Sequence, residues 1–159
     1  MTNPKPQVAQ SVFEFRVQNL HLCMPLTEVS RTLQMVALQA LPLAPDYLIG
    51  LLNYHGKSVP VFDLAIRLGL QRHEPYNLDT PIVICNHPQG LRGAIVDEVI
   101  GVTERYSDQI QQTELVGEAG TPLQGTFTDH NEIILLADMQ RLLEIDAAVP
   151  LPATKNPES

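Results

Sequence analysis

The sequence predicts an all-β protein with a few short helices. Apolar and polar residues alternate over short segments, as where Phe13, Phe15 and Val17 flank Glu14 and Arg16, and this period of two is typical of half-buried strands. The 13 prolines and 9 glycines interrupt the chain at short intervals, which favours turns between short strands. Helical periodicity is confined to two short segments, so long helices are not expected.

In the first half of the chain, strands are expected at about 13–17 and 20–24, followed by an extended or mixed segment at 27–37. Two prolines exclude a long helix from the segment that comes next, residues 41–47. The pattern then predicts a hairpin whose turn contains His55, Gly56 and Lys57. Its arms are residues 48–54 and 58–62. Because Pro60 has no amide hydrogen, the second arm is expected at a sheet edge or a bulge.

Two segments of similar pattern, VPVFDLAIRLGL (59–70) and IILLADMQRLLE (133–144), place an aspartate between an apolar strand and a short helix. Asp63 and Asp138 are suitable N-caps, and Gly69 suits the end of the first helix. The similarity suggests two related subdomains, or a chance repeat, since strand-to-helix turns often use Asp. Further strands are expected at about 81–86, 91–96, 99–106, 122–128 and 132–137.

Composition and charge exclude several classes of function. The net charge is −8, and the ten Lys and Arg form no basic stripe of the kind that nucleic-acid binding requires. No apolar run approaches the ~18 residues that span a bilayer, and no basic amphipathic helix indicates membrane-surface binding. Charged residues make up 18% of the chain, below the roughly 25% of average soluble proteins. Such a surface suits a protein covered by partners, or reflects ordinary sequence drift.

The expected organisation is one ordered domain between two loose ends. Residues 1–10 are expected to form a flexible arm without the apolar core of a signal peptide, and residues 147–159 a flexible tail. Residues 11–146 form the ordered domain. Cys23 and Cys85 lie in separate apolar segments without a CxxC motif, so two buried free thiols are favoured over a disulfide.

Patterns typical of catalysis or metal binding were not found. His21 and Cys23 have a spacing that could chelate a metal ion, but a zinc site needs three or four ligands. Asp97 and Glu98 point to opposite faces of a strand, so they are expected as solvent-exposed charges rather than as an acid–base pair. The five histidines are scattered: His21, His55, His73, His87 and His130. The sequence therefore predicts no enzyme activity, no cofactor and no metal.

An ordered set of residues in the segment 25–70 follows one spacing pattern. Its members are Leu41, Pro42, Pro45, Gly50, Asn53, Gly56, Pro60, Val61, Asp63, Leu64, Leu68 and Gly69. This pattern resembles that of the CheW-like domain family. Residues 93–102 resemble the family's G-x-x-V-D-x-V segment, and residues 133–143 resemble its closing strand and helix. The resemblance spans about residues 11–146.

The resemblance implies two packed, five-stranded SH3-like β-barrel subdomains, in agreement with the strand count and the repeated segment. It also implies a non-enzymatic adaptor. One barrel would bind the regulatory domain of a CheA-type histidine kinase, and the groove between the barrels would bind the cytoplasmic tip of a methyl-accepting chemoreceptor. Such a protein would be cytoplasmic, without direct membrane insertion, and recruited to the inner face of the membrane through receptor arrays.

By position, Val29 matches the family's groove valine. The expected receptor-binding residues are Val29, Arg31, Ile49, Gly50, Asn53, His55, Val99 and Val102. The apolar members of this set could equally belong to a barrel core. Arg31 and His55 stand where the family usually has Glu and Arg, so the charge at this edge is altered. This predicts either a divergent member of a specialised chemosensory system or a neutral co-substitution.

Two alternatives remain open. The chain could be a regulatory domain detached from a kinase or from a CheV-like protein, although 159 residues leave no room for a kinase core or a receiver domain. It could also be a small β-barrel enzyme or ligand-binding protein, which would require a deep polar pocket with clustered titratable groups.

Overall fold

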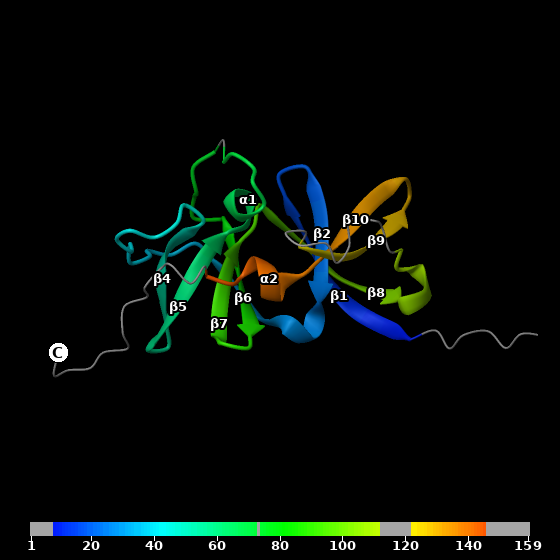
Figure 1. Cartoon of the computed structure of the whole chain (residues 1–159), viewed down its shortest axis with the longest axis horizontal. Coiled ribbons are helices and arrows are strands. Elements are labelled where there is room, and N and C mark those ends of the chain that lie inside the picture. Colours follow the sequence, from blue (N-terminus) through cyan, green and yellow to red (C-terminus); the bar gives the residue numbers. More distant parts are fainter. Residues whose placement is uncertain (1–7, 73, 112–121, 146–159) are drawn as a thin grey trace, which may run out of the picture.

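Ten strands form two five-stranded sheets in the computed structural model, which describes residues 8–72, 74–111 and 122–145 (Figure 1). The first sheet, barrel A, consists of β8 (Glu98–Tyr106), β1 (Ala9–Val17), β2 (Leu20–Pro25), β10 (Glu132–Ala137) and β9 (Leu123–Asp129), in that order. The second, barrel B, consists of β3 (Val29–Gln34), β6 (Pro81–His87), β7 (Gly90–Ile95), β5 (Lys57–Asp63) and β4 (Leu48–Tyr54). The helical elements are η1 (Leu26–Glu28), α1 (Leu64–Arg67), η2 (Ser107–Gln109) and α2 (Met139–Leu142). The predicted all-β class with short helices is confirmed.

The two barrels have the same topology. The antiparallel hairpin β1–β2 corresponds to β6–β7, and the parallel pair β2–β10 corresponds to β7–β5. A single bridge closes each sheet toward a barrel: Gln39 pairs with Leu51 in barrel B, and Gln111 pairs with Thr126 in barrel A. The repeated strand–Asp–helix segments are therefore equivalent parts of two related subdomains.

The two aspartates cap the helices as predicted. The Asp63 carboxylate accepts hydrogen bonds from the backbone N–H groups of Ala65 and Ile66, and the Asp138 carboxylate accepts one from Arg141. These bonds satisfy N–H groups that have no partner in the first helical turn. Gly69 follows α1 with φ +83°, a conformation that glycine adopts without steric cost.

Pro60 was expected at a sheet edge or a bulge, but β5 lies between β4 and β7. The strand tolerates this proline for a local reason. Both backbone hydrogen-bonding groups of its β4 partner, Leu51, pair with Gln39, so Pro60 has no hydrogen bond to make toward β4. On the other side, the pairing with β7 begins only at Val61. The missing amide hydrogen therefore costs the sheet nothing.

The largest apolar cluster lies between the barrels. Phe13 and Phe15 of β1 contribute from one side, Phe62 and Val83 from the other, and Leu142 of α2 adds to it. Each barrel also has its own smaller interior cluster. Since the chain forms β1 and β2, then all of barrel B, and then returns to barrel A, the two subdomains are intertwined in sequence as well as packed in space (Figure 1).

Cys23 and Cys85 are buried free thiols, as predicted. Strand β1 begins at Ala9, inside the segment expected as an arm, while residues 1–7 and the expected tail 147–159 lie outside the described residues. Within the described part of the chain, no helix is long and apolar enough to cross a membrane.

Candidate binding surface

Val29 and Val99 occupy equivalent positions in the two barrels. Val29 on β3 pairs with Cys85 of β6, and Val99 on β8 pairs with Phe15 of β1. The register of each edge strand then shifts by one residue, so β3 bulges at Ser30 and β8 bulges at the equivalent residue, Ile100. Both valine side chains are half-buried against the shared apolar cluster. The repeat thus brings two of the three predicted groove valines, Val29 and Val99, to the border between the barrels.

Three of the expected groove residues lie on β4 and have identifiable structural surroundings. Ile49 packs against the interior cluster of barrel B rather than against the shared cluster. A Cβ atom on Gly50 would lie 2.6 Å from the carbonyl oxygen of Gln39, so the bridge that closes barrel B requires glycine there. The side-chain oxygen of Asn53 accepts a hydrogen bond from the backbone N–H of Gly56 at 3.0 Å and stabilises the β4–β5 turn.

The remaining expected residues are exposed. Arg31 on β3 makes no hydrogen bond or ion pair with any residue that the structure describes. His55 lies in the β4–β5 turn with φ 52°, and its ring contacts that of Tyr54 at 4.5 Å between centroids. Val102 is 54% exposed on the edge strand β8, near Ile100, which is 41% exposed. The outer surface of β8 therefore presents apolar side chains to solvent.

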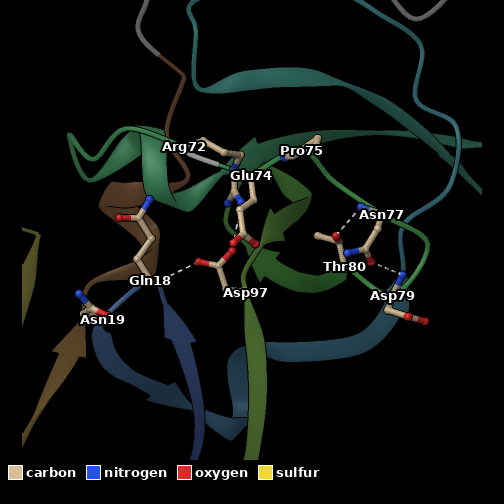
Figure 2. Close-up of a pocket in the computed structure, with 9 residues that line it drawn as sticks. All are labelled: Gln18, Asn19, Arg72, Glu74, Pro75, Asn77, Asp79, Thr80 and Asp97. Carbon is tan, nitrogen blue, oxygen red and sulfur yellow. Dashed lines mark hydrogen bonds and ion pairs between the residues drawn. The ribbon is translucent and has the colours of Figure 1, made fainter.

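Arg72 joins two aspartates, Asp63 and Asp97, at one end of the contact between the barrels. Figure 2 shows Arg72 and Asp97 side by side. The Nε of Arg72 lies 2.5 Å from Oδ2 of the fully buried Asp63, and its Nη1 lies 3.1 Å from Oδ1 of Asp97. The Tyr76 hydroxyl donates a hydrogen bond to Asp63 as well. Asp97 also accepts the backbone N–H of Gln18 at 2.6 Å, so the cluster ties the β1–β2 turn of barrel A to the α1–β6 loop of barrel B.

The cluster is permanently charged at its centre. Burial lowers the pKa of Arg72, but the hydrogen bonds and charges of Asp63 and Asp97 outweigh burial and raise it. Burial raises the pKa of Tyr76, and the hydrogen bond to Asp63 raises it further, so the phenol keeps its proton. Asp97 was expected as a solvent-exposed strand-end charge, and it is exposed. Its ion pair with Arg72 was not predicted, because sequence spacing did not reveal Arg72 beside it.

A polar cleft of about 500 Å³ opens beside this cluster, between the β1–β2 turn and the α1–β6 loop (Figure 2). It is lined by Gln18, Asn19, Arg72, Glu74, Pro75, Asn77, Asp79, Thr80 and Asp97. The cleft is thus a boundary between the barrels, although none of its lining residues belongs to the predicted groove. Sequence patterns indicated only a polar loop at 71–79, not the cleft itself.

Glu14 was expected on the polar face of a half-buried strand, but it is buried, with 2% of the residue exposed. The prediction failed because both faces of β1 are covered, one by the shared cluster and one by barrel A itself. The carboxylate accepts hydrogen bonds from Arg105 at 3.0 Å and from Thr103, and it lies 2.7 Å from Nε2 of His21. Burial raises the pKa of Glu14, yet these hydrogen bonds outweigh it and leave the pKa below its ordinary value.

The buried pair of Glu14 and His21 has no polar counterpart in barrel B. Counting back from the hairpin turns, the positions of Glu14 and His21 correspond to Ile84 and Leu91 in barrel B, whose interior is apolar. The other nitrogen of His21, Nδ1, lies 3.0 Å from the Glu132 carboxylate, without the geometry of a hydrogen bond. Within the described ranges, no group of three or more His, Cys, Asp or Glu is arranged to hold a metal ion.

Comparison with known proteins identifies relatives of the whole fold. The model of the CheW-like domain family matches residues 11–147. A probable chemotaxis protein CheW from Rhizobium etli is 26% identical over 104 residues, which cover 65% of this chain and 66% of the relative. The chemotaxis protein CheW from Rhizobium meliloti is 23% identical over 141 residues, which cover 89% of this chain and 88% of the relative.

A solved structure shares the fold. The crystal structure of the scaffolding protein TtCheW from Thermoanaerobacter tengcongensis superposes with a TM-score of 0.78 at 22% identity, covering 87% of this chain and 95% of that one. The expected pair of packed five-stranded SH3-like subdomains is confirmed by this likeness and by the two sheets.

Proposed function

Because this chain belongs to the CheW-like domain family, we propose that it is a non-enzymatic signalling adaptor that couples methyl-accepting chemoreceptors to a CheA-type histidine kinase. The observation that carries this proposal is the family match over residues 11–147, supported by two intertwined barrels of the same topology. We take residues 11–146 as the functional unit. The alternative of a small β-barrel enzyme or ligand-binding protein is not favoured by these findings.

We expect the receptor tip to bind along the border between the barrels. Val29 and Val99 flank the shared cluster there, and Val102 extends the surface outward along β8. A receptor tip is a helical hairpin, and helices commonly dock an apolar stripe into a groove with a polar rim. Arg31 lies two residues after Val29 and supplies a positive charge on that rim. Gly50 and Asn53 support this surface indirectly, through the closure and the turn of barrel B.

The kinase regulatory domain is assigned to one of the two barrels, as in the family pattern. Binding of both partners at once recruits the adaptor to the inner face of the membrane through receptor arrays, without insertion of its own chain. The charge change at Arg31 and His55 suits a specialised chemosensory system whose receptor carries a matching charge pattern.

The test is a reconstitution with purified partners from the same genome, a receptor-tip fragment and a kinase regulatory domain, followed by isothermal titration calorimetry. Both fragments should bind the adaptor, and the three should form a ternary complex. The Val102→Asp variant should weaken receptor binding roughly tenfold, since a charge then replaces an apolar contact. Leu43→Asp is the matched control, because Leu43 is 94% exposed and lies outside the proposed groove.

Three outcomes would count against the proposal. If the folded adaptor binds neither fragment, the proposed adaptor function is refuted. Equal losses of receptor affinity for Val102→Asp and Leu43→Asp would refute the assigned groove. If receptor binding is insensitive to Arg31→Glu and His55→Arg, the hypothesis of a specialised charge pattern is refuted and the two positions are neutral substitutions.

A further inference from the structure

His21 lies between two carboxylates in the interior of barrel A. Its side chain is 9% exposed, its Nε2 lies 2.7 Å from Oε1 of Glu14, and its Nδ1 lies 3.0 Å from Oε1 of Glu132. Glu14 belongs to β1 and Glu132 to β10, and these are the two strands on either side of β2, which carries His21. One imidazole therefore contacts acids of both neighbouring strands.

The charge of the imidazole decides how many of these contacts are favourable. A neutral ring has one N–H group and one lone pair, whereas a charged ring has two N–H groups. Glu14 is the more deeply buried acid, with 2% of its side chain exposed, so a single ring hydrogen is best placed on Nε2. Nδ1, which has no hydrogen-bond partner among the described residues, then presents a lone pair to Glu132. The charged ring, in contrast, attracts both carboxylates.

The ion pairs around His21 balance when the ring is charged. Arg105 pairs with Glu14 and Asp129, and Arg16 pairs with Glu132. These contacts join three acids to two arginines, so a charged His21 supplies the third positive charge. The groups come from every strand of barrel A that neighbours the ring: Glu14 and Arg16 of β1, Arg105 of β8, Asp129 of β9 and Glu132 of β10.

Three further polar groups lie near the ring or its partners. Thr103 donates a hydrogen bond to Glu14 and carries no charge. Cys23 lies two residues from His21 on the same strand, and burial raises the pKa of its thiol to about 12, so it stays neutral. His130 is 97% exposed and lies 3.4 Å from Asp129. A change of charge inside barrel A near neutral pH therefore falls to His21, with His130 outside it in solvent.

The tip of the β9–β10 hairpin depends on these cations. Asp129 and Glu132 lie directly opposite each other beside the turn, and like charges in that arrangement destabilise a strand pair. Arg105 offsets the charge of Asp129, while Arg16 and His21 offset that of Glu132. His21 is the main cause that holds the pKa of Glu132 below its ordinary value, and Arg16 adds to this effect. The hairpin tip is thus tied to β1, β2 and β8 through charge.

Barrel B forms the same topology without a titratable group at the corresponding positions. Ile84 and Leu91 stand there, and both belong to the apolar interior of that barrel. The fold itself therefore does not require a histidine between two acids. The arrangement is a property that barrel A has in addition to its fold.

We propose that His21 is a proton-operated clamp, which holds the tip of the β9–β10 hairpin through Glu132 when the ring is charged and releases it when the ring is neutral. Glu132 is 42% exposed, so it can turn into solvent after release. Glu14 keeps the Nε2 hydrogen and Arg105 in both states, so barrel A stays folded. The clamp is closed while Glu132 is ionised and His21 is charged, and it opens as the pH rises and the ring loses its proton. It is independent of which partner the adaptor binds.

The test is an NMR titration of the full chain in a His130→Gln background, so that the exposed imidazole of the turn does not itself titrate. The ring of His21 and the backbone amides of residues 131–133 are followed together between roughly pH 5 and 9. The amides should shift with the same midpoint as the ring. Their hydrogen exchange, corrected for its intrinsic dependence on pH, should be roughly threefold or more faster above that midpoint.

Glu132→Gln removes the clamped carboxylate without touching the buried pair. In this variant His21 should lose its proton at a pH lower by about 0.5 unit or more, because an acid that stabilised the charged ring is gone, and the turn amides should no longer follow the ring. Glu74→Gln is the matched control, since Glu74 is an exposed acid in the α1–β6 loop of barrel B. A ring that keeps one charge state over the whole range, turn amides that titrate apart from the ring, or equal His21 midpoints in the two variants would each overturn the proposal.

Discussion

Replacing Arg72 by methionine should destabilise the protein more than any replacement of an exposed charge. The substitution keeps most of the side-chain volume but leaves Asp63 as a carboxylate with no exposed surface and no cation. Breaking a buried ion pair from one side costs about 3–5 kcal/mol. Asp63 keeps the two backbone N–H groups of α1 and the Tyr76 hydroxyl, so the lower end, about 3 kcal/mol, is expected. For a domain of this size, that corresponds to a melting temperature about 6–12 °C lower.

The assay is urea unfolding followed by circular dichroism, with Lys57→Met as the control, because Lys57 is an exposed cation without an ion pair in the described part of the chain. The control should change the free energy of unfolding by less than about 0.5 kcal/mol. A double-mutant cycle of Arg72→Met with Asp63→Asn should show a coupling of about 2 kcal/mol or more. A loss below about 1 kcal/mol for Arg72→Met alone would refute the reasoning, since the carboxylate would then be satisfied without its cation.

Three further predictions follow from single sites. Because the pKa of Glu14 is below its ordinary value of 4.5, its interactions stabilise the fold above that pH and are lost as the pH falls below it. Glu14→Gln should therefore cost about 1–3 kcal/mol at pH 7 and flatten the acid limb of the curve of unfolding free energy against pH; an unchanged acid limb would contradict this. Gly50→Ala should cost about 1–3 kcal/mol in thermal unfolding, because its Cβ would strike the Gln39 carbonyl, and a neutral result would show that the bridge can shift. Burial raises the pKa of Cys23 and Cys85 to about 12, so a thiol reagent at pH 8 should modify them only after unfolding, and fast labelling of the native protein would contradict their burial.

Local rules were sufficient where neighbouring residues decide the structure. Asp63 and Asp138 were predicted as N-caps because the capping bonds reach only two or three residues along the chain, and both caps are present. The strands were found for the same reason, since alternation and turn residues are local signals. Even the repeat was visible, as two similar segments, although its full extent depends on pairings between distant strands.

Local rules failed where distant parts of the chain meet. The period of two assigns each residue of β1 to a face, but it does not say that both faces are covered, so Glu14 was misjudged. Arg72 lies in a segment that was predicted only as a polar loop, and its two aspartate partners are 9 and 25 residues away in the sequence. Such ion pairs leave no periodic signature, because any loop of suitable length could bring a cation there. The valines were located through the family resemblance rather than through their own pattern.

The border between the barrels is built before any partner arrives. Its apolar part is the largest cluster of the described fold, and residues of both barrels and α2 share it. Its polar parts include two ties, Arg72 with its aspartates at one side and Arg67 with the carbonyl oxygens of α2 at another. A rotation of one barrel against the other would have to break these ties and expose shared core residues. A partner that docks at Val29 and Val99 therefore meets a rigid surface, and discrimination between partners falls to side chains on its rim, of which Arg31 is one.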